Sequence, residues 1–211
     1  MTSALSPIVR CPYCAAELAG PPKRMTRCPA CRQPIVVRSK AVRLFDRVLL
    51  TEREALVADT FPQLESLGVT ASAFQQQLAT RPQSASRAAD ALWTLWNEAV
   101  LARPDLAESQ YVPMALFVNA EGRDARYLLE AKHRTTLSRL KRYSDTSGLG
   151  VTVQVLSSGD GCAACERLSG STFPLDVALS DMPLPVKDCT YMIPPGQHPF
   201  CRCVYLVDID V

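Results

Sequence analysis

Nine cysteines carry most of the chemistry that this sequence can perform, and eight of them fall into closely spaced pairs. The first two pairs are Cys11-Pro-Tyr-Cys14 and Cys28-Pro-Ala-Cys31, which share a Cys-Pro-x-Cys form. Two residues between the sulfurs let the backbone turn tightly enough for both thiolates to reach one ion. The 13 residues between the pairs suffice for a hairpin that returns the chain. This spacing predicts a four-thiolate zinc ribbon with Cys11, Cys14, Cys28 and Cys31 as ligands.

A second group of candidate ligands lies near the other end of the sequence. Cys162-Ala-Ala-Cys165 again has knuckle spacing, and a proline-rich loop separates it from His198-Pro-Phe-Cys201-Arg-Cys203. The last two cysteines are expected on a strand, where residues two apart point to the same side. A closed structural site commonly takes four thiolates, which favours sulfur over histidine. The predicted ligands are Cys162, Cys165, Cys201 and Cys203, with Cys189 and His198 as alternates. Two zinc ions are therefore the expected cofactors.

Composition and compartment agree with metal binding. Hydrophobic residues make up 47% of the 211 residues and charged residues 21%, which is typical of globular proteins. The first ten residues contain no apolar segment of the length that a signal peptide needs, and no later run could span a bilayer. A cytoplasmic protein without membrane association is expected. Reducing conditions there favour metal-bound thiolates over disulfides.

The charge pattern leaves the partner open between protein and nucleic acid. The formal net charge is only +2, so affinity for nucleic acid would have to come from local groups of basic residues. Acidic neighbours in the second half of the chain and the scarcity of aromatic residues near the first cysteines favour solvated basic faces. The candidate nucleic-acid residues are Lys23, Arg24, Arg27, Arg32, Lys132, Arg139 and Arg142.

The segment 41–143 has the pattern of a helical core. Thr51 and Glu54 form a predicted capping box at the start of one helix, and Thr70 is expected to cap a shorter one. In the helix predicted from Ser86 to Arg103, two tryptophans lie on a wide apolar face. Because tryptophans at helical spacing usually fill a core, we interpret them as packing residues rather than a ligand surface.

Further elements lead from this core to the second cysteine group. An apolar segment is expected at Val112–Ala120 with Pro113 near its start, and a long basic helix from Asp124 to about Tyr143 with His133 on its surface. A polar turn at 144–150 and a strand at Val151–Leu156 follow. The predicted fold is mainly α with small β zinc modules, an α+β class in three parts. These are a zinc ribbon at 1–40, a helical core at 41–143, and a strand with a zinc-knuckle module at 144–211, packed on the core.

The C-terminal part resembles the phage Mu F-like head-morphogenesis family, whose domain occurs in minor head proteins. The likeness covers about residues 120–211 and rests on these motifs: Cys162-x-x-Cys165, Leu168-Ser169-Gly170, Pro194-Pro195 and His198-Pro-x-Cys201-Arg-Cys203. It implies zinc binding by Cys162, Cys165 and the Cys201/Cys203 pair, with His198 as a further candidate. The N-terminal part resembles short bacterial zinc ribbons, which bind nucleic acid, bind protein or cap a fold.

These observations favour a zinc-binding, non-catalytic structural or interaction protein, with a phage or prophage relation implied by the resemblance. A closed four-sulfur site leaves no position for water, so it cannot act as a Lewis acid. One alternative is a zinc-dependent hydrolase or nuclease with an open site near His198 and an acidic base. The candidate bases are Asp160, Glu166 and Asp188. Another is thiol exchange by Cys162 and Cys165, although the strand-helix alternation of that fold is missing.

Overall fold

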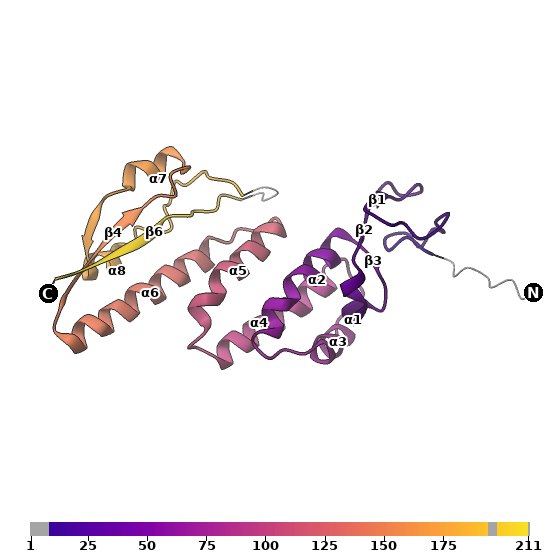
Figure 1. Cartoon of the computed structure of the whole chain (residues 1–211), viewed down its shortest axis with the longest axis horizontal. Coiled ribbons are helices and arrows are strands. Elements are labelled where there is room, and N and C mark those ends of the chain that lie inside the picture. The colour runs from indigo at the N-terminus through magenta and orange to yellow at the C-terminus, as the bar shows by residue number, and fades with distance from the viewer. Residues whose placement is uncertain (1–8, 194–197, 211) are drawn as a thin grey trace, which may run out of the picture. The chain divides into compact units, whose positions relative to one another are not determined.

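The structure, a computed structural model, describes residues 9–193 and 198–210 (Figure 1). It divides into two units, Met1–Ala102 and Arg103–Val211. The boundary lies between α4 (Arg87–Ala102) and α5 (Ala107–Ala120), inside the segment 41–143 that we expected to form one helical core. Pro194 and Pro195, part of the motif that carries the phage resemblance, lie outside the described residues. Helices and two three-stranded sheets together give an α+β fold.

The N-terminal unit begins with a small antiparallel sheet. Its strands, in the order β1-β2-β3, are β1 (Thr26–Arg27), β2 (Pro34–Val37) and β3 (Leu49–Leu50). Thr26 pairs with Ile35, and Val36 pairs with Leu50. Ile35 is completely buried in one cluster with Cys11 and Cys28. The sheet and the first cysteines therefore share a single small core.

Helices complete this unit, and two of them start at the predicted caps. They are η1 (Ser39–Ala41), α1 (Val42–Phe45), α2 (Glu52–Glu65), α3 (Ala71–Ala79) and α4. The Thr51 hydroxyl accepts the Glu54 amide at 3.1 Å, and the Glu54 carboxylate accepts the Thr51 amide at 3.0 Å, so the capping box is confirmed. Thr70 likewise caps α3. Trp96 is completely buried and Trp93 half-buried, as the packing interpretation requires.

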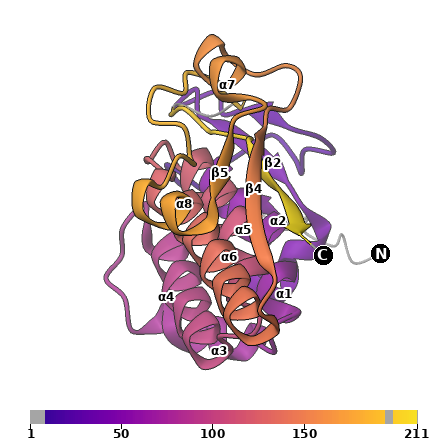
Figure 2. The same ribbon diagram turned by 90° about the vertical axis from the view of Figure 1, so that its left-hand side faces the viewer.

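The C-terminal unit places a sheet against a long helix. Besides α5 it contains α6 (Arg126–Ser147), β4 (Gly150–Leu156), α7 (Ala163–Leu168), β5 (Thr172–Pro174), α8 (Leu175–Asp181) and β6 (Val204–Asp210). The antiparallel sheet has the order β5-β4-β6 and lies over α6 (Figure 2). Leu137 of α6, Val153 of β4 and Leu175 of α8 meet in its main buried cluster. The helix thus covers one face of the sheet.

Two helix boundaries differ from the prediction. α5 begins at Ala107 rather than near Val112, so Pro113 lies inside the helix and not in its first turn. Burial of Met114 and Phe117 on this helix outweighs the one hydrogen bond that a proline removes. α6 continues to Ser147 through the expected polar turn. It stops at Gly148, whose φ of 71° suits glycine and ends the helix.

His133 is the clearest error of the sequence-based prediction. It was expected on the surface of α6, but only 3% of it is exposed, and its ring lies 5.4 Å from that of Tyr205 on β6. Leu129 and Leu137 lie one turn before and after it, and both are buried. Burial, and to a smaller extent the positive charge of Lys132, lowers the pKa of His133 to about 3. This histidine is therefore a neutral core residue.

None of the helices in the described part of the chain combines the length and the apolar character that a bilayer span needs.

Candidate metal centres

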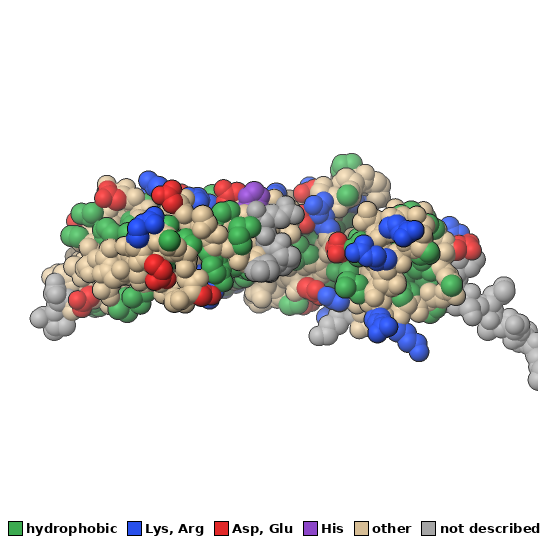
Figure 3. Space-filling model, turned by 90° about the horizontal axis from the view of Figure 1, so that it is seen from above, with side chains coloured by type: hydrophobic (Ala, Val, Ile, Leu, Met, Phe, Trp, Pro, Cys, Tyr) green, Lys and Arg blue, Asp and Glu red, His purple; other side chains and the backbone are tan. Residues whose placement is uncertain are grey.

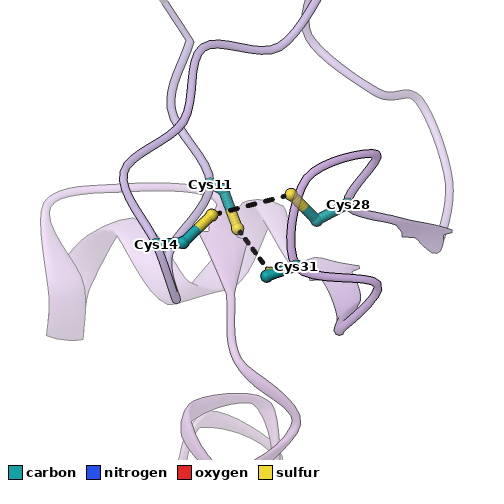
Figure 4. A group of neighbouring side chains, drawn as sticks. All are labelled: Cys11, Cys14, Cys28 and Cys31. Atoms are coloured by element: carbon teal, nitrogen blue, oxygen red, sulfur yellow. Dashed lines mark hydrogen bonds between the residues drawn. The ribbon is translucent and has the colours of Figure 1, made fainter.

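Four cysteines from the two N-terminal knuckles converge on one point (Figure 4). The Sγ atoms of Cys11 and Cys31 are 3.8 Å apart, as are those of Cys14 and Cys28, and all four sulfurs lie within 4.8 Å of one another. A tetrahedral ion with metal–sulfur bonds of about 2.3 Å keeps its ligand sulfurs about 3.8 Å apart. Two of the sulfur pairs are therefore already at the separation that such an ion requires, and the remaining pairs are no more than 4.8 Å apart.

The two knuckles fold in the same way although their sequences differ. In each, the first cysteine accepts a hydrogen bond from the amide four residues later: Ala15 to Cys11 at 3.0 Å, and Arg32 to Cys28 at 2.9 Å. Ala15 and Arg32 both take the left-handed conformation, with φ of 58° and 64°. Since that conformation costs a non-glycine residue about 1–2 kcal/mol, the cysteine geometry rather than local preference must set these turns.

Backbone amides donate to sulfurs of this cluster and favour the thiolate form at Cys28, whereas burial and the neighbouring thiols raise the pKa of Cys31 to about 12. The Tyr13 amide donates to the Cys11 sulfur at 3.4 Å. The Cys31 amide, directed at Cys28, is the main cause that lowers the pKa of Cys28 to about 6. Because the thiolate is the form that binds metal, these amides prepare the site for a cation.

The C-terminal cluster contains five cysteines, one more than predicted as ligands. Cys162, at the start of α7, and Cys165, within it, have sulfurs 3.6 Å apart, and Cys165 is also 3.6 Å from Cys189. Cys201 and Cys203 lie in the irregular segment directly before β6, not on a strand as expected. The sulfurs form two groups of three, and within each group all sulfurs lie within 4.8 Å of one another. The first group is Cys162, Cys165 and Cys189, and the second is Cys165, Cys201 and Cys203.

The five thiols differ in their surroundings. The amides of Thr190 and Cys165 lower the pKa of Cys162 to about 6. Burial, in contrast, raises the pKa of Cys165 and Cys189 and brings that of Cys203 to about 11. A cation bound among these sulfurs would stabilise the thiolate form that burial disfavours.

His198, the alternate ligand, has a different partner. Its Nε2 atom lies 2.7 Å from the carbonyl oxygen of Gly122, to which it donates. This contact ties the segment before Cys201 to the end of α5. Among the described residues, both C-terminal groups of candidate ligands consist of cysteine alone.

A polar clasp, formed by Asp160, Tyr191 and Arg202, joins the three segments that carry the C-terminal cysteines. The Arg202 guanidinium lies 2.9 Å from the Asp160 carboxylate, donates to the Tyr191 hydroxyl at 2.8 Å, and stacks 5.2 Å from that ring. A hydrogen bond from Ser158, and then the Arg202 charge, lower the pKa of Asp160. Sequence reasoning missed this clasp, although each member lies within two residues of a cysteine.

The predicted basic residues fall into two classes. In the ribbon, Lys23, Arg24, Arg27 and Arg32 are exposed, and none forms an ion pair with a described residue. Figure 3 shows several Lys and Arg side chains gathered on the N-terminal unit. In the other unit, Arg139 forms an ion pair with Glu108 at 3.2 Å, so its charge is already balanced. Lys132 and Arg142 form no ion pair within the described part of α6 or its neighbours.

No family model, no curated protein and no solved structure matches this chain. The resemblance to phage Mu F-like domains and to bacterial zinc ribbons therefore stays a prediction that rests on the motifs.

Proposed function

We propose that this protein is a zinc-binding, non-catalytic interaction protein whose two cysteine centres maintain the shape of a nucleic-acid-binding ribbon and of a C-terminal module. The observation that carries the metal assignment is the mutual approach of the four N-terminal sulfurs within 4.8 Å. Thiolate ligands select zinc, copper(I) or iron–sulfur clusters, and a closed tetrahedral set of four is typical of structural zinc. The cluster of five thiols supports a second centre of the same chemistry.

Metal content tests the first step directly. Purified full-length protein should contain tightly held zinc, and replacement by cobalt should give the absorption of a tetrahedral thiolate site. Cys14→Ser should remove the N-terminal ion and unfold the ribbon, because binding free energy is folding free energy in such modules. Thr26→Ser, a conservative change at an exposed ribbon position, is the matched control. Unchanged zinc content in the Cys14 variant would overturn the assignment.

The charge distribution favours nucleic acid over a protein partner. Residues 9–38 contain six basic residues and one acidic residue, a net charge of +5, so the rest of the chain carries −3 of the total +2. Four thiolates and one divalent ion would carry −2 and leave the ribbon at +3. Such an asymmetry is typical of chains that contact phosphates. The four unpaired basic residues of the ribbon are the proposed contacts.

Salt-dependent binding to generic duplex DNA and single-stranded RNA tests this partner. The logarithm of the binding constant falls linearly with the logarithm of the salt concentration. Each phosphate contact contributes about 0.9 to this slope on duplex DNA and about 0.7 on a single strand. Lys23→Ala with Arg24→Ala should therefore reduce the slope by about 1.4–1.8. The matched control is Arg43→Ala with Arg47→Ala, which removes the same amount of positive charge. Because these two arginines already pair with Glu65 and Glu54, the control should change the salt slope little.

Failure to bind either nucleic acid at low salt, with zinc content intact, would refute the partner but not the metal centres. Equal binding to vesicles of anionic lipid would show that the ribbon recognises negative charge in general.

A zinc-dependent hydrolase near His198 has less support. The Nε2 atom of His198 is engaged by a backbone carbonyl. Of the candidate bases, Asp160 pairs with Arg202, and Glu166 accepts a hydrogen bond from Ser157 at 2.6 Å. These carboxylates support the loops around the cysteines rather than an open catalytic site.

A further inference from the structure

We infer that the C-terminal centre binds two metal ions that share the Cys165 thiolate, rather than a single ion. This inference rests on the proposed metal binding and concerns how the ions are held. The N-terminal cluster provides an internal comparison, because all four of its sulfurs lie within 4.8 Å of one another. Among the five C-terminal sulfurs no such set of four occurs. They form two sets of three, and Cys165 belongs to both.

Geometry gives each set the form of one face of a coordination tetrahedron. Three sulfurs at mutual distances near 3.8 Å can hold one ion above the plane that they define. Cys165 lies 3.6 Å from both Cys162 and Cys189, and all three sulfurs lie within 4.8 Å of one another, so they can form the first face. Cys201 and Cys203 form the second face with the same Cys165. A thiolate sulfur has more than one lone pair and can therefore bridge two ions.

Charge also favours two ions. Four of the five cysteines are buried, and only Cys162 is half-buried. One divalent ion with four thiolates carries a formal charge of −2 and leaves a fifth buried thiol without a role. Two divalent ions with five thiolates carry only −1. Because burying net charge is unfavourable, the two-ion arrangement suits this interior better.

The two positions differ in their access to water. Each ion would have three sulfur ligands and one further position. The half-buried Cys162 brings the first position close to solvent, so water can supply the fourth ligand there. The proposed non-catalytic role then rests on Asp160 and Glu166, which are engaged by Arg202 and Ser157 and so are not free to act as a base. Cys165, Cys201 and Cys203 are all buried, which shields the second position. The first ion should therefore exchange with added metal faster than the second.

Cadmium-113 substitution of the full-length protein is the decisive experiment. We expect three cadmium resonances, of which two show mutual cadmium–cadmium coupling, because such coupling requires a shared bridging thiolate. Native mass spectrometry of the zinc form should give three ions per chain. A single uncoupled C-terminal resonance, or two zinc ions per chain, would overturn the inference and leave the proposed function intact. Absence of any C-terminal ion would refute the proposed C-terminal centre itself.

Cysteine variants give an independent test, with the N-terminal ion as the internal reference for metal loading and far-UV circular dichroism as the control for folding. Cys165→Ser should remove both C-terminal ions, whereas Cys203→Ser should remove one and abolish the coupling. A single four-thiolate ion predicts instead that one of the five cysteines can be replaced without loss of metal. Such a silent position would contradict the two-ion arrangement. If a variant does not fold, the coupling in the unmodified protein still decides.

Discussion

Acid should destabilise the C-terminal unit through His133. Burial between α6 and the Tyr205 ring lowers its pKa from the ordinary value of 6.5 to about 3. The folded unit therefore holds the imidazole neutral, while the unfolded chain takes up a proton below pH 6.5. The stability that this group contributes is complete above pH 6.5 and is lost as the pH falls toward about 3.

The size of the effect follows from the two pKa values. The free energy of unfolding can fall by at most about 1.36 kcal/mol per pH unit for one proton. Integrated between pH 8 and pH 5, the loss is about 2 kcal/mol, a large part of the stability of an ordinary domain. Lys132, the charged neighbour on the same helix, acts in the same direction.

Urea unfolding at both pH values, with and without His133→Leu, measures this contribution. Acid also protonates the cysteines and weakens metal binding, but this affects both proteins equally, so the difference between them isolates His133. Far-UV circular dichroism follows the helices of both units, and fluorescence of Trp93 and Trp96 identifies the transition of the N-terminal unit, so the other dichroism transition belongs to the C-terminal unit. The unmodified protein should lose about 2 kcal/mol more than the variant. If both lose the same amount, His133 is not buried in its neutral form and the reasoning is wrong.

Three further predictions concern other parts of the chain. Thr51→Ala should destabilise the N-terminal unit by about 1 kcal/mol in urea unfolding because α2 loses its cap, whereas Thr51→Ser should retain most of the stability; equal loss in both would argue against the capping box. Arg202→Ala breaks the clasp and should speed zinc transfer from the C-terminal centre to a chelator, with the N-terminal rate as the reference; unchanged rates would show that the clasp does not hold the cysteine segments. Removal of all metal by a chelator should make the backbone amides of residues 9–38 exchange faster with solvent hydrogen, while the amides of β4 and α6 stay protected. Loss of protection in both units would contradict an independent C-terminal core.

The N-terminal centre could be predicted from the sequence because its four cysteines lie within one short stretch with a repeated spacing. A hairpin is enough to bring Cys11 and Cys31 together. The C-terminal cluster is assembled from three segments, and no local rule places Cys189 beside Cys165. That contact depends on how the loop after α8 returns across α7. For the same reason, the separation of His198 from the sulfurs could not be foreseen from its position three residues before Cys201.

Errors within the helices have a different origin. The caps at Thr51 and Thr70 were predicted because a cap depends on residues only three apart. His133 was predicted to be a surface residue because no cysteine or acidic partner for it was found nearby in sequence. The spacing of four from Leu129 and again to Leu137 was the better guide, since residues four apart share a helix face.

The two centres contribute differently to folding, because they are built into different cores. In the ribbon, two of the four buried residues of the local cluster are themselves cysteines, beside Ile35 and Leu49. With so small an apolar cluster, we expect most of the folding free energy of the module to come from metal binding. In the C-terminal unit, the cluster around Leu137 and Val153 contains no cysteine and joins the sheet to its helices. Ions bound there would order the loops that the clasp also joins. We therefore expect that centre to gain and lose metal while its unit stays folded, whereas the ribbon should unfold when its metal is removed.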